Sequence, residues 1–196
     1  MKKIAFILIS LCLSVAAATA QTADFKKAVG KYKAAKTVTA QVKKTVSKAA
    51  LAKSEVTRGT LTMKAPSEVS IVMEGGKDQL LMKGSAFTMV ARGKQHATDS
   101  RENPQFATFQ TVFESILSGG EKSISGLTDL KITRQGQQLV LTITPQAADK
   151  KSRRRMMFTS LVLTIDTQTS QLSSLTMKER NGNTTVYTFS AFDFKK

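Results

Sequence analysis

The chain has no tryptophan, and its single cysteine, Cys12, lies in an apolar run near the N-terminus. It also has one histidine and three prolines among its 196 residues. If the N-terminal run is removed as a signal, no cysteine remains, which excludes disulfides, a thiol nucleophile and a cysteine metal site. Stability must then come from an ordinary hydrophobic core, which a chain of this length can build as a single domain.

The lone histidine, His96, also argues against most hydrolytic chemistry. A Ser-His-Asp triad would depend on it, and no serine stands in a Gly-x-Ser-x-Gly motif. The 14 acidic residues are scattered, and no zinc-binding spacing is present. We therefore predict a protein that is not an enzyme and uses no metal or other cofactor. A carboxylate pair assembled by folding and a lipid hydrolase that depends on His96 stay open as minor hypotheses.

Residues 1–20 have the order of a secretory signal, with basic Lys2 and Lys3, an apolar stretch, and small residues ending at Ala20. We predict cleavage before Gln21, so that residues 21–196 form one mature domain. No later run approaches the roughly 18 apolar residues of a membrane-spanning helix. The sequence thus predicts a periplasmic protein exported by a cleavable signal peptide.

Positive charge dominates the chain, with 30 basic residues against 14 acidic ones and a net charge of +16. In a cytosolic protein this balance would suggest nucleic acid, but an exported chain without a recognition motif is predicted to bind none. Anionic lipid headgroups or acidic proteins are better candidates. The densest basic cluster lies between two predicted strands and is either a solvated loop or a docking loop; it comprises Lys150, Lys151, Arg153, Arg154 and Arg155.

Alternation of apolar and polar residues predicts most of the chain to be antiparallel β-strand. A helical pattern with one apolar stripe precedes the strands, over residues 22–36. Near the C-terminus, Phe192 and Phe194 are out of phase with the preceding alternation, which indicates a β-bulge or a strand that is apolar on both faces. We count roughly ten strands, at residues 38–43, 59–64, 69–73, 79–82, 87–91, 130–132, 139–143, 161–165, 175–177 and 187–191.

An apolar helical pattern over residues 103–117 interrupts these strands. Asn103 suits the N-cap, Pro104 suits the first turn, and Gly119 follows as a stop signal. Two interpretations stay open: an ordinary helix that fills one mouth of a barrel, or a movable lid over an apolar cavity. The apolar residues recur on one helical face, at Phe106, Phe109, Val112, Phe113, Ile116 and Leu117.

The predicted strands are rich in methionine, whose flexible side chain adapts to ligands of irregular shape but also fills ordinary cores. Together with the phenylalanine-rich helix, these methionines favour a cavity for flexible aliphatic chains over a pocket for a polar metabolite. The candidate acyl-chain cavity is lined by Leu61, Met63, Ile71, Met73, Met82, Phe87, Met89, Leu141, Ile143, Leu163 and Met177. The fold class predicted is mainly β with helices (α+β): a single unclosed antiparallel barrel, or strongly curved sheet, with an N-terminal helix and a central apolar lid helix.

The order of these segments resembles the periplasmic lipoprotein carrier family LolA. The resemblance rests on the signal, the N-terminal helix, the Gly-Thr-Leu-Thr-Met-Lys-Ala-Pro stretch at residues 59–66, the central helix, and residues 181–189 near the C-terminus. It implies an unclosed barrel, lidded by helices, that holds the acyl chains of lipoproteins. It also implies two partners, an inner-membrane transporter that releases the lipoproteins and an outer-membrane acceptor, and we expect the carrier to be a monomer.

The chain departs from that family at one position on the early strand. Family members usually have Arg-Pro there, and the arginine ties the lid shut, whereas this chain has Ala65-Pro66. The adjacent Lys64 should face the opposite side and cannot reproduce the arginine fork. We therefore expect the lid to close by apolar packing of its Phe face, in a divergent family member. A lipid- or lipoprotein-binding sensor of the same fold that does not transport its ligand is the alternative hypothesis.

Overall fold

The structure, a computed structural model, describes residues 21–49, 54–91, 93–146 and 156–196. The predicted signal peptide and the cluster Lys150, Lys151, Arg153, Arg154 and Arg155 therefore lie outside the described residues. Among the helices that are described, none is both long enough and apolar enough to cross a membrane.

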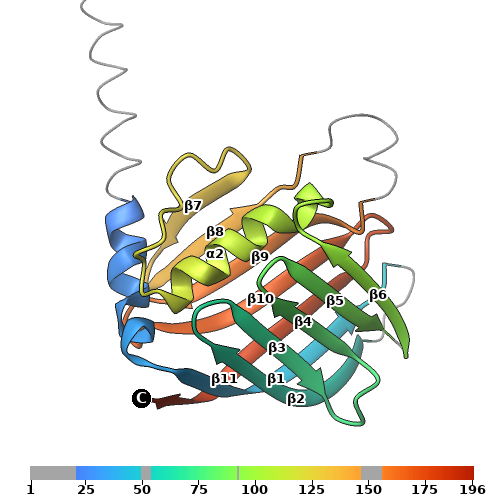
Figure 1. Cartoon of the computed structure of the whole chain (residues 1–196). Coiled ribbons are helices and arrows are strands. Elements are labelled where there is room, and N and C mark those ends of the chain that lie inside the picture. Colours follow the sequence, from blue (N-terminus) through green and yellow to red (C-terminus); the bar gives the residue numbers. More distant parts are fainter. Residues whose placement is uncertain (1–20, 50–53, 92, 147–155) are drawn as a thin grey trace, which may run out of the picture.

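Eleven strands form one antiparallel sheet in the order β6-β5-β4-β3-β2-β1-β11-β10-β9-β8-β7 (Figure 1). Two meanders, β1 to β6 and β7 to β11, meet where β1 pairs with β11. Strands β6 and β7 are the two edges, so the predicted unclosed, curved antiparallel sheet is confirmed. The strands are β1 (Thr37–Ser47), β2 (Ser54–Lys64), β3 (Glu68–Met73), β4 (Gln79–Lys83), β5 (Ala86–Ala91), β6 (Lys94–Asp99), β7 (Leu130–Gln135), β8 (Gln138–Ile143), β9 (Phe158–Asp166), β10 (Gln171–Glu179) and β11 (Thr184–Lys195).

The predicted N-terminal helix is present, but it is shorter than expected and ends in a tighter turn. Residues 21–29 are α-helical, and the 3₁₀ helix η1 (Gly30–Ala34) continues them. The apolar stripe is buried, and the Tyr32 hydroxyl accepts a hydrogen bond of 3.1 Å from the backbone N–H of Leu172 on β10. This bond ties the N-terminal segment to the C-terminal meander.

The central helix lies where the sequence predicts it, but its first turn differs. A 3₁₀ turn, η2 (Pro104–Phe106), leads into α2 (Ala107–Leu117). The expected side-chain cap by Asn103 is wrong: the Phe106 N–H donates to the Asn103 carbonyl, and the Asn103 side-chain oxygen accepts from Gln105 instead. The predicted stop is confirmed, because Gly119 has a φ of +67° and donates its N–H to the carbonyl of Ile116.

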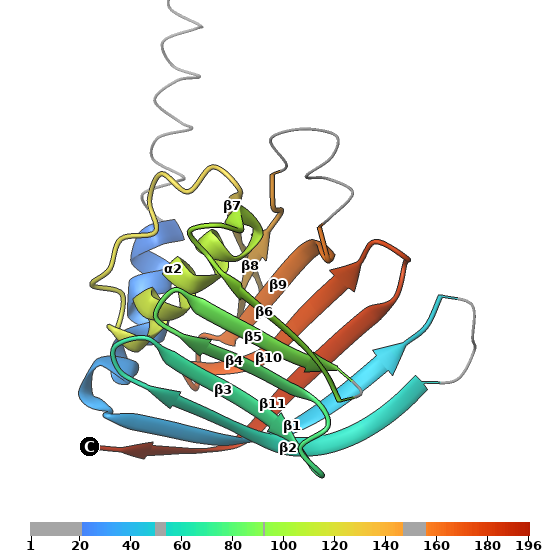
Figure 2. The same cartoon turned by 45° about the vertical axis from the view of Figure 1, so that its right-hand side comes forward.

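Figures 1 and 2 show α2 lying over the curved sheet, between the two meanders and beside the N-terminal helix. In Figure 2 the hairpin of β1 and β2 extends well beyond α2, at the end of the sheet opposite the N-terminal helix. We call this end the mouth. The apolar core sits between α2 and the sheet, because alternate residues of the strands point to that side.

The out-of-phase phenylalanines near the C-terminus mark a β-bulge, as predicted. The β1–β11 register shifts between Thr39 and Gln41, and Ala191 adopts a φ of +51°. After the bulge, Phe194 meets Tyr32 edge to face, with ring centroids 5.1 Å apart. The bulge thus turns the end of β11 toward the N-terminal segment.

The predicted strand count was one too low, because the sequence pattern does not reveal β6. This edge strand reads Lys-Gln-His-Ala-Thr-Asp, and its first four residues are exposed. A strand with water on both faces shows no apolar alternation, and charged or polar residues are common on sheet edges.

Candidate functional site

The candidate cavity lining comes together on the inner face of the sheet. Ten of its eleven residues are buried, and Met89 is half-buried. They come from both meanders, yet all belong to, or pack against, one continuous hydrophobic cluster. In this structure the candidate lining is therefore packed as a core, and a ligand would have to separate residues that now touch.

The candidate lid residues face that lining. Phe106, Phe109, Val112, Phe113 and Ile116 are all buried, with exposed fractions of 1% or less. On the opposite side of α2, Gln110, Thr111 and Glu114 are partly exposed. The helix is amphipathic as predicted, and Phe106 lies in η2, just before α2 begins.

A row of five phenylalanine rings runs from the mouth into the core. Phe158 on β9 meets Phe106 at a centroid distance of 6.3 Å, and Phe106 stacks on Phe87 of β5 at 4.1 Å. Phe87 meets Phe109 edge to face at 5.9 Å, and Phe109 lies 4.7 Å from Phe113. Offset and edge-to-face ring pairs of this kind contribute roughly 0.5–1.5 kcal/mol each beyond area burial. The row therefore holds the start of the helix against both meanders.

Polar contacts add to this apolar closure. Thr108 on α2 donates a 2.6 Å hydrogen bond to Asp129, and the Gln105 side-chain oxygen accepts from the Met157 backbone N–H at 3.0 Å. Ser100 donates to Gln110. The expected packing of the Phe face is thus present, and side-chain hydrogen bonds accompany it.

The C-terminal end of α2 is packed tightly against the N-terminal segment. A Cβ atom on Gly119 would lie 2.6 Å from Cβ of Lys33, and one on Gly120 would lie 3.0 Å from the Cα atom of Lys26. Lys33 and Glu121 form an ion pair of 2.5 Å, and its hydrogen bond lowers the pKa of the Glu121 carboxyl. Close backbone approach leaves this end of the helix little room to move.

At the position where LolA-like proteins usually have arginine, this chain has Ala65, which makes a backbone contact. The Ala65 N–H donates to the carbonyl of Lys36 at 3.3 Å, and the side chains of Ala65 and Lys64 are exposed. Lys64 points away from the buried Met63 beside it, as the alternation predicts.

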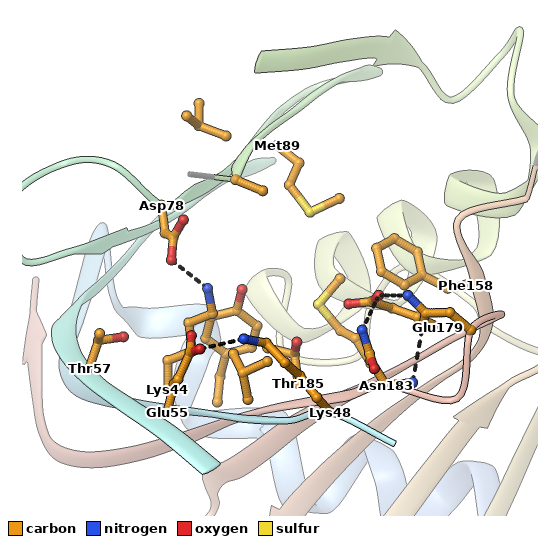
Figure 3. A pocket seen from close by; sticks show the side chains of 16 residues that line it. Lys44, Lys48, Glu55, Thr57, Asp78, Met89, Phe158, Glu179, Asn183 and Thr185 are labelled. Carbon is orange, nitrogen blue, oxygen red and sulfur yellow. Dashed lines mark hydrogen bonds and ion pairs between the residues drawn. The ribbon is translucent and has the colours of Figure 1, made fainter. Parts of the chain in front are cut away.

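An open pocket of about 370 Å³ lies at the mouth, between the ends of β1, β2, β10 and β11 (Figure 3). We call it the mouth pocket. It is close to the lower end of the range for small-molecule sites. Apolar side chains on its inner side include Met89, Phe158 and Met177, and a neighbouring pocket of about 220 Å³ shares Met89 and reaches Phe87 and Phe106. The mouth pocket thus adjoins the outer end of the phenylalanine row.

The mouth pocket also holds charged residues that the sequence analysis missed. Lys44 of β1 pairs with Asp78 at 2.6 Å, and both side chains are largely shielded from solvent. Lys48 pairs with Glu55 nearby. The signal for Lys44 was available, because it continues the inward alternation of Val38, Ala40 and Val42. No sequence pattern could place Asp78, which lies just before β4, opposite it.

Tyr187 lies beside Lys44 in the β1–β11 ladder and is buried. Burial raises the pKa of the Tyr187 hydroxyl above its ordinary value, and the negative charges of Asp78 and Glu179 raise it further. The Tyr187 hydroxyl is therefore held in its protonated form at the inner end of the mouth pocket.

His96, the residue on which a hydrolase would depend, is exposed on the edge strand β6 and lines the smaller pocket. Within the ranges that the structure describes, no three histidine, aspartate or glutamate side chains come together in a way that could hold a metal ion.

Comparison with known proteins shows one family. The sequence profile described as "Outer membrane lipoprotein carrier protein LolA" matches residues 33–196. No curated protein matches the chain significantly.

Solved structures resemble this one only distantly. The LolA superfamily protein NE2245 from Nitrosomonas europaea is 10% identical, with a TM-score of 0.41 over 89% of this chain and 93% of that one. The Mycobacterium tuberculosis lipoprotein LppX is 12% identical, with a TM-score of 0.41 over 89% of this chain and 95% of that one. A putative outer membrane lipoprotein-sorting protein domain from Vibrio parahaemolyticus is 10% identical, with a TM-score of 0.38 over 89% and 94%. Structural similarity this low supports no argument about function. The family match is the comparison that bears on function.

Proposed function

This chain belongs to the family of the outer membrane lipoprotein carrier protein LolA, and from that membership we propose that it carries lipoproteins through the periplasm, from the inner to the outer membrane. The acyl chains would lie between α2 and the inner face of the sheet, against the candidate lining residues. The observation that supports this most is the continuous apolar surface that the helix and both meanders share. Its residues are predominantly aliphatic and aromatic, as a binding surface for alkyl chains requires.

The lid would open at the Phe106 end of α2. The other end is held by the close approach of Gly119 to Lys33, whereas Phe106 and Phe158 border the mouth. Opening there would separate the ring contacts of Phe106 with Phe87 and Phe158 and the hydrogen bond between Gln105 and Met157. Acyl chains entering from the mouth would take the place of the rings on η2 and α2, Phe106, Phe109 and Phe113, against the candidate lining.

The free energy of acyl-chain transfer limits how open and how stable the empty carrier can be. At about 0.8 kcal/mol per buried methylene, a sixteen-carbon chain gains about 13 kcal/mol on leaving water, and two or three chains anchor a lipoprotein firmly in a membrane. A carrier must offset most of that energy and also give up its own core contacts when it opens. We therefore propose an inner-membrane transporter that drives loading and an outer-membrane acceptor that binds the acyl chains better.

The positive charge of the chain suits its proposed encounters with the inner-membrane transporter and with the outer-membrane acceptor. With 30 basic residues against 14 acidic ones, the protein would be attracted to anionic headgroups or to acidic surfaces on its partners. The cluster at residues 150–155 is the candidate docking segment. Salt should weaken this attraction, because exposed charges are screened within about 10 Å at moderate ionic strength.

The proposal is tested by purifying the exported protein from a bacterial periplasm under mild conditions and recording its native mass. Lipid and peptide analysis then identifies what it releases, and a transfer assay follows between inner-membrane vesicles and an outer-membrane fraction. Bound lipoprotein that is passed on in many turnovers supports the carrier. Stoichiometric binding without release would instead indicate a sensor that does not transport, and a protein that neither contains nor takes up acylated ligand would contradict both.

A further inference from the structure

The mouth pocket brings charged side chains of both signs together. Among the residues that the structure describes, its lining includes two lysines, Lys44 and Lys48, and three carboxylates, Glu55, Asp78 and Glu179. The two lysines each pair with a carboxylate, Lys44 with Asp78 and Lys48 with Glu55. Of these described lining carboxylates, one lies outside the two lysine pairs.

This carboxylate is Glu179, at the end of β10. Its side-chain oxygen Oε2 accepts hydrogen bonds from the amides of Asn181 at 3.1 Å and Asn183 at 3.5 Å. Both donors are neutral, so they orient the carboxylate without cancelling its charge. Across the described part of the chain, the recorded ion pairs of the pocket leave Glu179 without a lysine or arginine partner.

The surroundings of Glu179 suit the junction between a polar head and an acyl chain. Phe158 and Met177 line the same pocket, and Figure 3 shows Glu179 close to Phe158 and Asn183. Phe158 is the outermost ring of the phenylalanine row. A ligand with its alkyl chain along that row would therefore place its polar end within reach of Glu179.

We propose that the mouth pocket binds the primary ammonium group of an acylated ligand, with Glu179 as its ion-pair partner. The inference rests on the proposed function and adds the chemistry of the ligand's head. The Glu179 carboxylate would repel an anionic head, whereas an ammonium group neutralises this carboxylate and can donate up to three hydrogen bonds. The group could be the free α-amine of a lipidated N-terminal cysteine or the headgroup of an aminophospholipid, and the two sources separate by experiment.

The test compares two synthetic lipopeptides that differ in one charge. Both carry the same two palmitoyl chains on a glyceryl cysteine and the same uncharged peptide, but one has a free α-amine and the other is N-acetylated. The wild-type protein should bind the free amine about tenfold more tightly, the size expected for hydrogen bonds to a charged group. Glu179→Gln, which keeps an oxygen acceptor for Asn181 and Asn183, should remove the preference, whereas Glu102→Gln on an exposed turn should retain it.

Each outcome separates the inference from the proposed function. If wild type binds both lipopeptides equally tightly, the ammonium site is wrong and the carrier proposal stands. If it binds neither, but takes up phosphatidylethanolamine in preference to phosphatidylglycerol through Glu179, the pocket assignment stands and the lipoprotein cargo is contradicted. If none of these ligands binds, both proposals fail. A preference that persists in Glu179→Gln also overturns the inference.

Discussion

Phe106, at the start of the central helix, stacks on Phe87 of β5 with ring centroids 4.1 Å apart and ring planes inclined by 19°. The two residues are separated by strand β6 in the sequence, and their contact joins the helix to the N-terminal meander. Phe106 also meets Phe158 of the other meander. One side chain thus links three parts of the fold at the point where the proposed lid borders the mouth.

Truncating this side chain should loosen the lid at the mouth. We expect Phe106→Ala to lower the free energy of unfolding by about 3 kcal/mol and to speed the uptake of an acylated fluorescent probe, because the ring that blocks entry is gone. The control is Ile116→Ala, a similarly buried truncation near the other end of α2, which should cost comparable stability without speeding uptake. Urea unfolding and stopped-flow fluorescence measure the two effects. Equal acceleration by both variants would rule out entry at the Phe106 end.

A charge on the inner face of the helix should prevent loading. Phe109→Glu places a carboxylate in the apolar core beside Phe87 and Phe113, so it should hold the lid away from the core or abolish retention of acyl chains. Thr111→Glu adds the same charge on the outer side of α2 and should load normally. Retention of bound lipoprotein after gel filtration distinguishes the two. Normal retention by Phe109→Glu would show that the lid assignment is wrong.

The close packing at the other end of the helix can be measured with a pair of glycines. Gly119 and Gly136 both have positive φ, +67° and +60°, but a Cβ would meet Lys33 at 2.6 Å in the first case and nothing within 4 Å in the second. Gly136→Ala should cost about 1 kcal/mol for the left-handed backbone alone. Gly119→Ala should cost at least about 1 kcal/mol more, seen as a lower urea midpoint. Equal costs would mean that the helix end is not held by this contact.

The two tyrosines predict how stability changes at alkaline pH. Burial raises the pKa of Tyr32 to about 12, and the pKa of Tyr187 is raised for the same reason. A folded pKa above the unfolded value of about 10 favours the protonated, folded state, so this stability is present below pH 10 and is lost as the pH rises toward 12. Because both pKa values are raised, tyrosinate absorbance should stay low until well above pH 10 in the native protein. The chain has no tryptophan, so no indole absorbance overlaps this signal.

The control for this titration is the protein in concentrated denaturant, where both tyrosines should ionise near pH 10. Tyr187→Phe should remove one of the two ionisations and flatten the loss of stability. A native titration that coincides with the denatured one would contradict the burial of these hydroxyls.

The apolar layer of this fold is readable from sequence, because a strand with one buried face must alternate. Val38, Ala40 and Val42 on β1 and Leu61 and Met63 on β2 follow that rule and are all buried. The central helix is equally clear, since its apolar face recurs with helical period. Strand β6 escaped prediction because it lies at an edge with polar residues on both faces.

The candidate site was only half predictable, for a physical reason. A methionine such as Met82 packs the same way in a core and against an alkyl chain, so the pattern cannot separate a cavity lining from a core, and in the structure it is buried in the core. The polar part of the mouth pocket depends on contacts between distant segments, such as Lys44 with Asp78. Asn103 failed as a side-chain cap because Gln105 occupies its oxygen, a local competition that residue preference alone does not resolve.

The most direct test of the account is a distance measurement between the helix and the sheet. The mature chain predicted here has no cysteine, so spin labels can be attached at Thr111→Cys on the outer side of α2 and at Thr88→Cys on the outer face of β5. A second pair, at Thr62→Cys and Thr176→Cys, spans the sheet itself and serves as the control. Loading with a diacylated lipopeptide should lengthen the Thr111–Thr88 distance and leave the control distance unchanged. Tight binding of the lipopeptide with no change in the helix-to-sheet distance would contradict a lid that moves to admit acyl chains.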